Sequence, residues 1–90
     1  MTNIENDLVI QKNAVIELIN EGEFAEAWFA TKLLAGLWET AGYKYKTLEL
    51  IERLESALFY AMNDKKKYTL KQRRNLEGLY AQVRGQWMRM

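Results

Sequence analysis

The sequence predicts an all-α protein of one domain, residues 1–90, folded as an antiparallel four-helix bundle. Apolar residues recur at three- and four-residue steps along most of the chain, which is the spacing of helices with one buried face. The chain contains no proline, and Gly22 and Gly42 separate periodic stretches where a helix is expected to end. Amphipathic helices joined by short connections pack antiparallel with their apolar faces inward. A bundle is therefore the expected arrangement.

The first two helices are expected over residues 4–20 and 23–41. Thr2 and Glu5 form a predicted capping box at the start of the first helix. The apolar stripe of that helix consists of Ile4, Leu8, Val15, Leu18 and Ile19. The second helix is the most apolar, and its expected core face consists of Phe24, Ala27, Trp28, Ala30, Thr31, Leu34, Ala35, Leu37 and Trp38. Phe29 falls on the other side and is expected to be partly exposed.

The last two helices are expected to begin at Thr47 and Thr69, with a short basic loop, residues 63–68, between them. Thr69 and Gln72 form a predicted capping box, in which the Thr hydroxyl accepts from the Gln backbone N–H and the Gln side chain accepts from the Thr N–H. The third helix has an apolar stripe made of Leu50, Ile51, Leu54, Leu58 and Ala61 or Met62. The stripe of the fourth consists of Leu76, Leu79, Tyr80, Val83 and Trp87.

The formal net charge of +1 conceals a strong asymmetry along the chain. Residues 1–42 hold seven acidic and two basic side chains, a net charge of −5, whereas residues 43–90 hold 11 basic and five acidic side chains, a net charge of +6. Such an asymmetry between halves favours a partner for the basic half. The alternative is that acidic helices pack beside basic ones.

The composition argues against chemistry at a conventional active site. The chain has no Cys and no His, so it offers no disulfide, no nucleophile–base pair and no nitrogen or sulfur metal ligand. Carboxylate pairs among Glu49, Glu52 and Glu55 fall on the exposed face of an amphipathic helix. We therefore expect no enzymatic activity, no cofactor and no metal. The acidic N-terminus does not resemble a signal peptide, and no apolar run approaches the ~20 residues of a membrane span. A cytoplasmic location is expected.

The remaining candidate site is a partner-binding surface on the basic loop and the fourth helix. Gly78 and Gly85 lie one heptad apart and off the core face, although an interior glycine costs a helix roughly 1 kcal/mol relative to Ala. They would leave a strip of bare backbone, bordered by cations, where another helix or an extended segment could dock. The alternative is that exposed helix glycines are simply tolerated. The predicted surface consists of Lys65, Lys66, Lys67, Lys71, Arg73, Arg74, Gly78, Arg84, Gly85 and Arg89.

One stretch of the chain resembles a known family. Leu50-Ile51-Glu52-Arg53-Leu54, then Leu58, a basic loop ending Lys67-Tyr68-Thr69, and then Gln72, Leu76 and Leu79 resemble the enterocin A immunity group of immunity proteins against pediocin-like bacteriocins. The resemblance covers about residues 24–80. It implies a cytosolic four-helix bundle that protects the producing cell by recognising the bacteriocin when it is engaged with a membrane sugar-permease receptor, the mannose phosphotransferase permease, and by blocking the pore. It also implies that the C-terminal half carries much of the specificity.

Two other functions stay open on the sequence. The first is a small nucleic-acid-binding protein that uses the basic last helix, which is disfavoured because the aromatic residues of that helix lie on its core stripe rather than among the cations. The second is a regulatory adaptor, or a bundle that dimerises, through the glycine strip. Association with a membrane surface is a further expectation.

Overall fold

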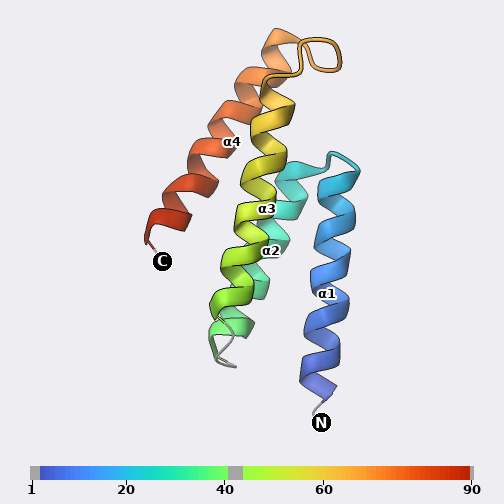
Figure 1. Cartoon of the computed structure of the whole chain (residues 1–90), viewed down its shortest axis with the longest axis vertical. Helices are drawn as coiled ribbons and strands as arrows, with labels where there is room; N and C mark the ends of the chain where they lie inside the picture. The colour runs from blue at the N-terminus through green and yellow to red at the C-terminus, as the bar shows by residue number, and fades with distance from the viewer. Residues whose placement is uncertain (1–2, 41–43, 90) are drawn as a thin grey trace. The chain divides into compact units, whose positions relative to one another are not determined.

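The computed structural model describes the backbone of residues 3–40 and 44–89, and the surroundings of the side chains of residues 8–37 and 47–86. The described residues form four α-helices and no strand: α1 (Asn3–Asn20), α2 (Phe24–Thr40), α3 (Lys44–Met62) and α4 (Leu70–Arg89) (Figure 1). The predicted all-α class of a four-helix bundle is thereby confirmed. The predicted capping box of Thr2 and Glu5 and the predicted helix end at Gly42 fall outside the described residues.

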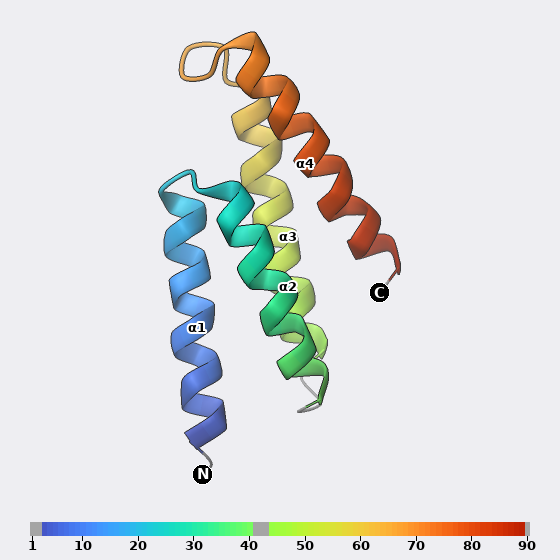
Figure 2. The same ribbon diagram turned by 180° about the vertical axis from the view of Figure 1, so that it is seen from behind.

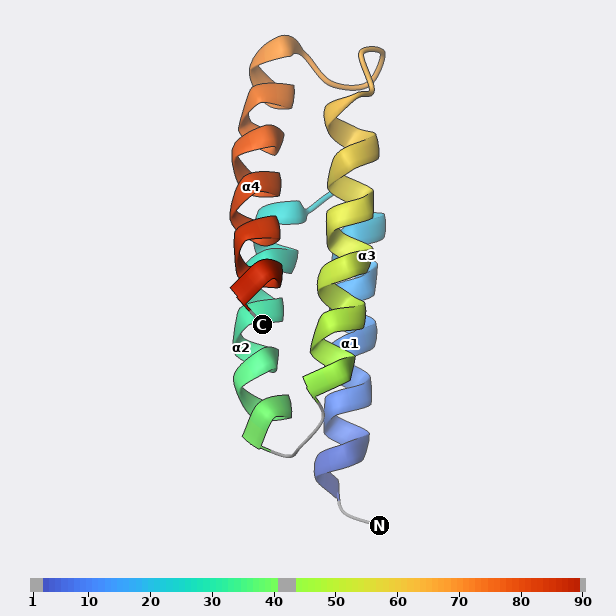
Figure 3. The ribbon, with the colours of Figure 1, turned by 60° about the vertical axis from the view of Figure 1, so that its left-hand side comes forward.

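The chain divides into two compact units, Met1–Leu50 and Ile51–Met90, with the boundary inside α3. In the first unit, α1 and α2 contact each other and run antiparallel (Figure 2). In the second unit, the end of α3 and α4 run antiparallel and are joined by the loop at one end (Figure 3). Each unit is therefore a helical hairpin, and the single domain expected from the sequence stays a prediction.

Gly22 ends α1 as the sequence predicts. Its φ of 82° is the left-handed conformation that glycine adopts without steric cost. The Gly22 N–H donates to the Ile19 carbonyl (3.1 Å), and the Glu23 N–H donates to the Leu18 carbonyl (2.9 Å). These two bonds define a Schellman motif, which satisfies carbonyls that the helix end would otherwise leave free.

The predicted stripes of the first unit are confirmed in part. Leu18, Ala30 and Ala35 are half-buried, and the side chains of Ile4 and Trp38 fall outside the described residues. The buried side chains of this unit are Leu8, Val15, Ile19, Phe24, Ala27, Trp28, Thr31, Leu34, Thr47 and Leu50. Leu37 was expected in the core face of α2, but its side chain is 53% exposed. The reason is its register, since Leu37 follows Phe29 and Leu33 by eight and four residues and shares their outward face. Phe29, at 61% exposed, lies outward as predicted.

The start of α3 differs from the sequence prediction. Thr47 was expected to be the N-cap, but the helix begins at Lys44 and Thr47 lies inside it. Thr47 precedes Leu50, Ile51 and Leu54 by three, four and seven residues, so it shares their buried face. Thr47 is therefore a buried residue within the helix and not its N-cap.

Most of the buried side chains of the second unit belong to α3. Ile51, Leu54, Leu58 and Ala61 are buried, whereas on α4 only Val83 reaches that state within the described side chains. The other predicted members of the α4 stripe, Leu76, Leu79 and Tyr80, are half-buried, and the side chain of Trp87 falls outside the described residues. The predicted face of α4 is therefore correct, but its burial is shallower than the sequence pattern implies.

Candidate functional site

The basic loop between α3 and α4 has a backbone conformation fixed by one carboxylate. Asp64 Oδ1 accepts hydrogen bonds from the backbone N–H groups of Lys66 and Lys67, both at 3.1 Å. The Asp64 carbonyl accepts from the Tyr68 N–H at 3.2 Å. This local bonding is typical of Asp at turns. Because the carboxylate is engaged with the backbone, the side chains of Lys65, Lys66 and Lys67 remain exposed.

Both ends of the loop are anchored as well. The Asn63 Nδ2 donates to the Phe59 carbonyl at 2.8 Å, which caps the end of α3. At the start of α4 the predicted capping box is confirmed: the Thr69 N–H donates to Gln72 Oε1 at 2.8 Å, and the Gln72 N–H donates to Thr69 Oγ1 at 3.2 Å. The lysines are therefore presented from an ordered turn rather than from a free linker.

The structure separates the ten predicted residues into two groups along α4. Eight of the ten are exposed: Lys65, Lys66, Lys67, Lys71, Arg74, Gly78, Arg84 and Gly85. Arg73 is half-buried, and its Nε has no hydrogen-bond partner among the described residues. Arg89 belongs to α4, but the surroundings of its side chain fall outside the described residues. Lys71 and Arg84 are about 20 Å apart along the helix axis, at ~1.5 Å per residue. The exposed cations of the loop and of the start of α4 form one group, which we call the basic group: Lys65, Lys66, Lys67, Lys71 and Arg74. Arg84 lies well away from it.

The positive charges of this group are poorly compensated. Among the described residues, Lys65, Lys66, Lys71 and Arg74 form no ion pair within 4.0 Å. The first turn of α4 contains no acidic residue. A helix N-terminus carries a partial positive charge, so each cation placed there costs about 0.3–1 kcal/mol at low ionic strength. The arrangement opposes the stability of α4, which favours a role in binding.

The glycine strip lies where the sequence places it. A methyl group added at Gly78 or at Gly85 would have no heavy atom within 4 Å. Both positions therefore face open space within the described part of the second unit. The position of the strip is as predicted, while its use by a partner stays a prediction.

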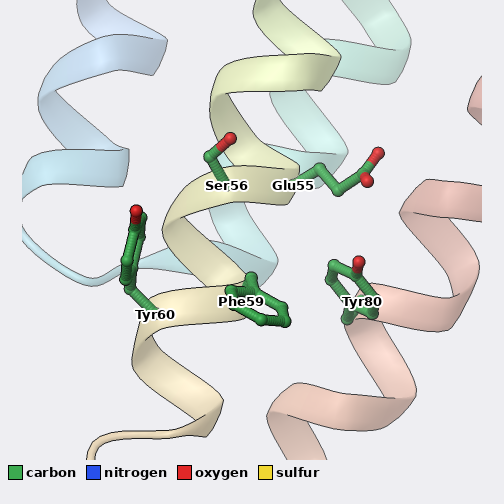
Figure 4. Close-up of a pocket in the computed structure, with 5 residues that line it drawn as sticks. All are labelled: Glu55, Ser56, Phe59, Tyr60 and Tyr80. Carbon is green, nitrogen blue, oxygen red and sulfur yellow. The ribbon is translucent and has the colours of Figure 1, made fainter.

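A second feature of this unit was not identified from the sequence. An open hollow of about 280 Å³ is lined by four residues of α3, Glu55, Ser56, Phe59 and Tyr60, and by Tyr80 of α4. Phe59 and Tyr80 face each other, and Tyr60 projects from the side of α3 away from α4 (Figure 4). The Phe59 ring is 6.0 Å from the Tyr60 ring in an edge-on arrangement and 6.3 Å from the Tyr80 ring, tilted by 48°. The side chains of Phe59 and Tyr60 are 49% and 74% exposed. The register of α3 contained this signal, because both residues lie off the stripe of Leu54, Leu58 and Ala61.

Arg84 extends the hollow on the α4 side. Its NH1 donates to the Tyr80 hydroxyl at 3.1 Å. Glu55 extends toward α4 from one turn before Phe59 (Figure 4). The hollow thus combines aromatic rings with one carboxylate at a partly exposed surface, and Arg84 is bonded to one of the lining residues. Aromatic residues and Arg are enriched at protein interfaces, whereas Glu is depleted there.

The first unit carries an apolar surface of its own on α2. Phe29, Leu33 and Leu37 follow one another at four-residue steps and are all more than half exposed. The Lys32 ammonium lies 5.4 Å from the Trp28 ring centroid and 6.0 Å from that of Phe29, which are cation–π distances. This outward stripe was not predicted as a unit, because Leu37 was assigned to the core.

No protein family, no curated protein and no solved structure matches this chain. Among the described residues, none of the helices combines the length and the apolar character needed to cross a bilayer. The same residues contain no group of three or more side chains that could hold a metal ion.

Proposed function

We propose that this protein is a bacteriocin immunity protein, which protects the producing cell by binding, from the cytosolic side, a bacteriocin engaged with a membrane sugar-permease receptor. The observation that carries the proposal is the basic group on the second unit, where exposed cations stand on an ordered loop without ion pairs among the described residues. The sequence resemblance over about residues 24–80 supports the same function. The resemblance implies that the C-terminal half carries much of the specificity, and the basic group narrows the expected contact region to residues 63–74.

The geometry of the loop suits recognition of a protein partner. A pre-ordered loop loses less conformational freedom on binding than a flexible one, so more of the contact energy is available as affinity. Uncompensated positive charges raise the rate of encounter with a complementary surface and fix orientation. The bonds of Asp64, Asn63 and Thr69 supply the order, and Lys65, Lys66 and Lys67 supply the charge.

A charge-reversal experiment tests the proposal. Lys65→Glu, Lys66→Glu and Lys67→Glu, combined in one variant, should abolish protection of a sensitive strain that expresses the protein and is challenged with the bacteriocin. The matched control carries Lys→Arg at the same three positions, keeps the charge and should protect. Circular dichroism should show both variants folded, because these side chains are exposed and form no ion pair with described residues. Full protection by the folded Glu variant would contradict the proposal.

A second candidate function is supported by one specific observation. Phe59 and Tyr60 expose their rings a few residues before the basic loop, which provides aromatic surface on which bases could stack. For a nucleic-acid-binding protein, the logarithm of the binding constant should fall linearly with the logarithm of the salt concentration. It would also lose affinity when Phe59 and Tyr60 are replaced by Leu. Salt-titrated binding to single-stranded RNA and DNA separates this function from immunity.

A further inference from the structure

The end of the second unit that holds the loop combines cations with one exposed apolar side chain. We define this surface as the basic tip, and it consists of Lys65, Lys66, Lys67, Leu70, Lys71 and Arg74. Leu70 is the first residue of α4 and is 55% exposed, although it directly precedes Lys71 and follows the loop by two residues. An exposed leucine among five cations does not serve the core of the hairpin.

The acidic groups near the basic tip do not neutralise it. Asp64 is half-buried, and its Oδ1 accepts from two backbone N–H groups of the loop. Glu77 is the next acidic residue along the chain; it follows Arg74 by three residues, about 4.5 Å along the helix axis at ~1.5 Å per residue, and Arg74 forms no ion pair within 4.0 Å among the described residues. The Lys67 ammonium lies 5.6 Å from the Tyr68 ring centroid, and the Lys67 side chain is exposed. The tip therefore presents five exposed cations and one exposed apolar side chain.

We infer that the basic tip binds the surface of a bilayer that contains anionic phospholipids. Lys and Arg pair with lipid phosphates while their aliphatic stems lie along apolar surface. Leu70 would enter the boundary between headgroups and acyl chains, where its side chain leaves water. A soluble polyanion would pair with the cations but would offer no apolar environment for the Leu70 side chain. This inference rests on the proposed function, since the anionic cytosolic leaflet is the place where a membrane-engaged bacteriocin would be met.

Vesicle co-sedimentation of the full chain tests the inference. The protein should bind vesicles made of an equal mixture of phosphatidylcholine and phosphatidylglycerol, and it should not bind vesicles of phosphatidylcholine alone. Lys65→Gln, Lys66→Gln and Lys67→Gln together should lower the partition coefficient on the order of 100-fold, since each cation near an anionic surface contributes a factor of about five. Lys→Arg at the same positions should keep binding, and Lys32→Gln on α2 is a matched control outside the tip.

Leu70→Ser distinguishes a lipid surface from a general polyanion. It should lower vesicle binding roughly five- to tenfold, because the apolar contribution is lost, and it should leave binding to soluble single-stranded RNA unchanged. Equal vesicle binding by the parent and the Leu70→Ser variant would overturn the inference, as would vesicle binding that is insensitive to the three Lys→Gln changes. The vesicle assays are done without bacteriocin, so their result is independent of the protection assay. A parent that binds vesicles but fails to protect would contradict the proposed function alone, and a parent that protects without binding vesicles would contradict this inference alone.

Discussion

Thr47→Val should stabilise the protein, although it replaces a residue inside a helix. The Thr47 side chain is fully buried, and its Oγ1 has no hydrogen-bond partner among the described residues. A buried hydroxyl without a partner costs about 1–3 kcal/mol, and Thr47→Val removes this cost. Threonine and valine have similar helix propensities and shapes. We expect the free energy of unfolding to rise by about 1–2 kcal/mol.

Thr31→Val is the matched control for this prediction. Thr31 is equally buried in the same unit, but its Oγ1 donates to the Ala27 carbonyl at 2.7 Å. Loss of that bond should lower the free energy of unfolding by about 0.5–1.5 kcal/mol. The two variants therefore make the same chemical change with opposite expected signs.

Thermal unfolding followed by circular dichroism measures both effects. A change of 1 kcal/mol shifts the Tm of a domain of this size by about 4–8 °C, so Thr47→Val should raise Tm by about 5–10 °C. Urea titration gives the same comparison at constant temperature through the midpoint. If Thr47→Val lowers stability as much as Thr31→Val, the Thr47 hydroxyl has a partner and the reasoning is refuted.

Three further predictions concern packing, capping and the glycine strip. Leu54→Ala should lower the free energy of unfolding by about 2–5 kcal/mol, because it leaves a cavity. Leu76→Ala should lower it by about half as much, because Leu76 is only half-buried. Equal decreases for the two variants in urea unfolding would contradict the burial pattern. Thr69→Ala should cost about 1 kcal/mol and raise amide exchange at residues 70–73, whereas unchanged protection would mean that the cap is dispensable. Gly78→Ala and Gly85→Ala should each raise the free energy of unfolding by about 1 kcal/mol, because alanine favours the helix more than glycine does. Loss of protection in the challenge assay would show that a partner needs the bare backbone at these positions, whereas intact protection would rule that out.

The elements that the sequence predicts correctly are those decided by residues close together in the chain. The capping box of Thr69 and Gln72 joins residues three positions apart, and the left-handed turn at Gly22 depends on one residue type. The start of α3 was missed because Thr47 has the chemistry of a cap, whereas in the structure it lies inside the helix with its side chain buried. A residue's capping preference is a weak guide where the fold places that residue in the core.

The candidate site was predictable in its charge but not in its surroundings. The number of neighbouring cations in the sequence identifies Lys65, Lys66 and Lys67, because side chains that stay exposed in the fold keep their full charge. The aromatic hollow required knowledge of which side chain of α4 meets Phe59, and that is Tyr80 on a separate helix. Periodicity identifies the face of a helix that turns inward, but it does not say how completely a neighbour covers that face. The half-buried state of Tyr80 and Leu76 reflects this difference.

The bonds that hold the basic loop have a consequence for how such a protein could diversify. Asp64, Asn63, Thr69 and Gln72 make them through side chains, and Lys66 and Lys67 take part only through backbone N–H groups. The side chains at residues 65–67 can therefore be exchanged without breaking these bonds, except that proline at 66 or 67 would have no N–H to donate. Framework and variable positions are separated within ten residues, 63–72. A lineage that kept the four framework residues could acquire new partners by substitutions at three neighbouring positions.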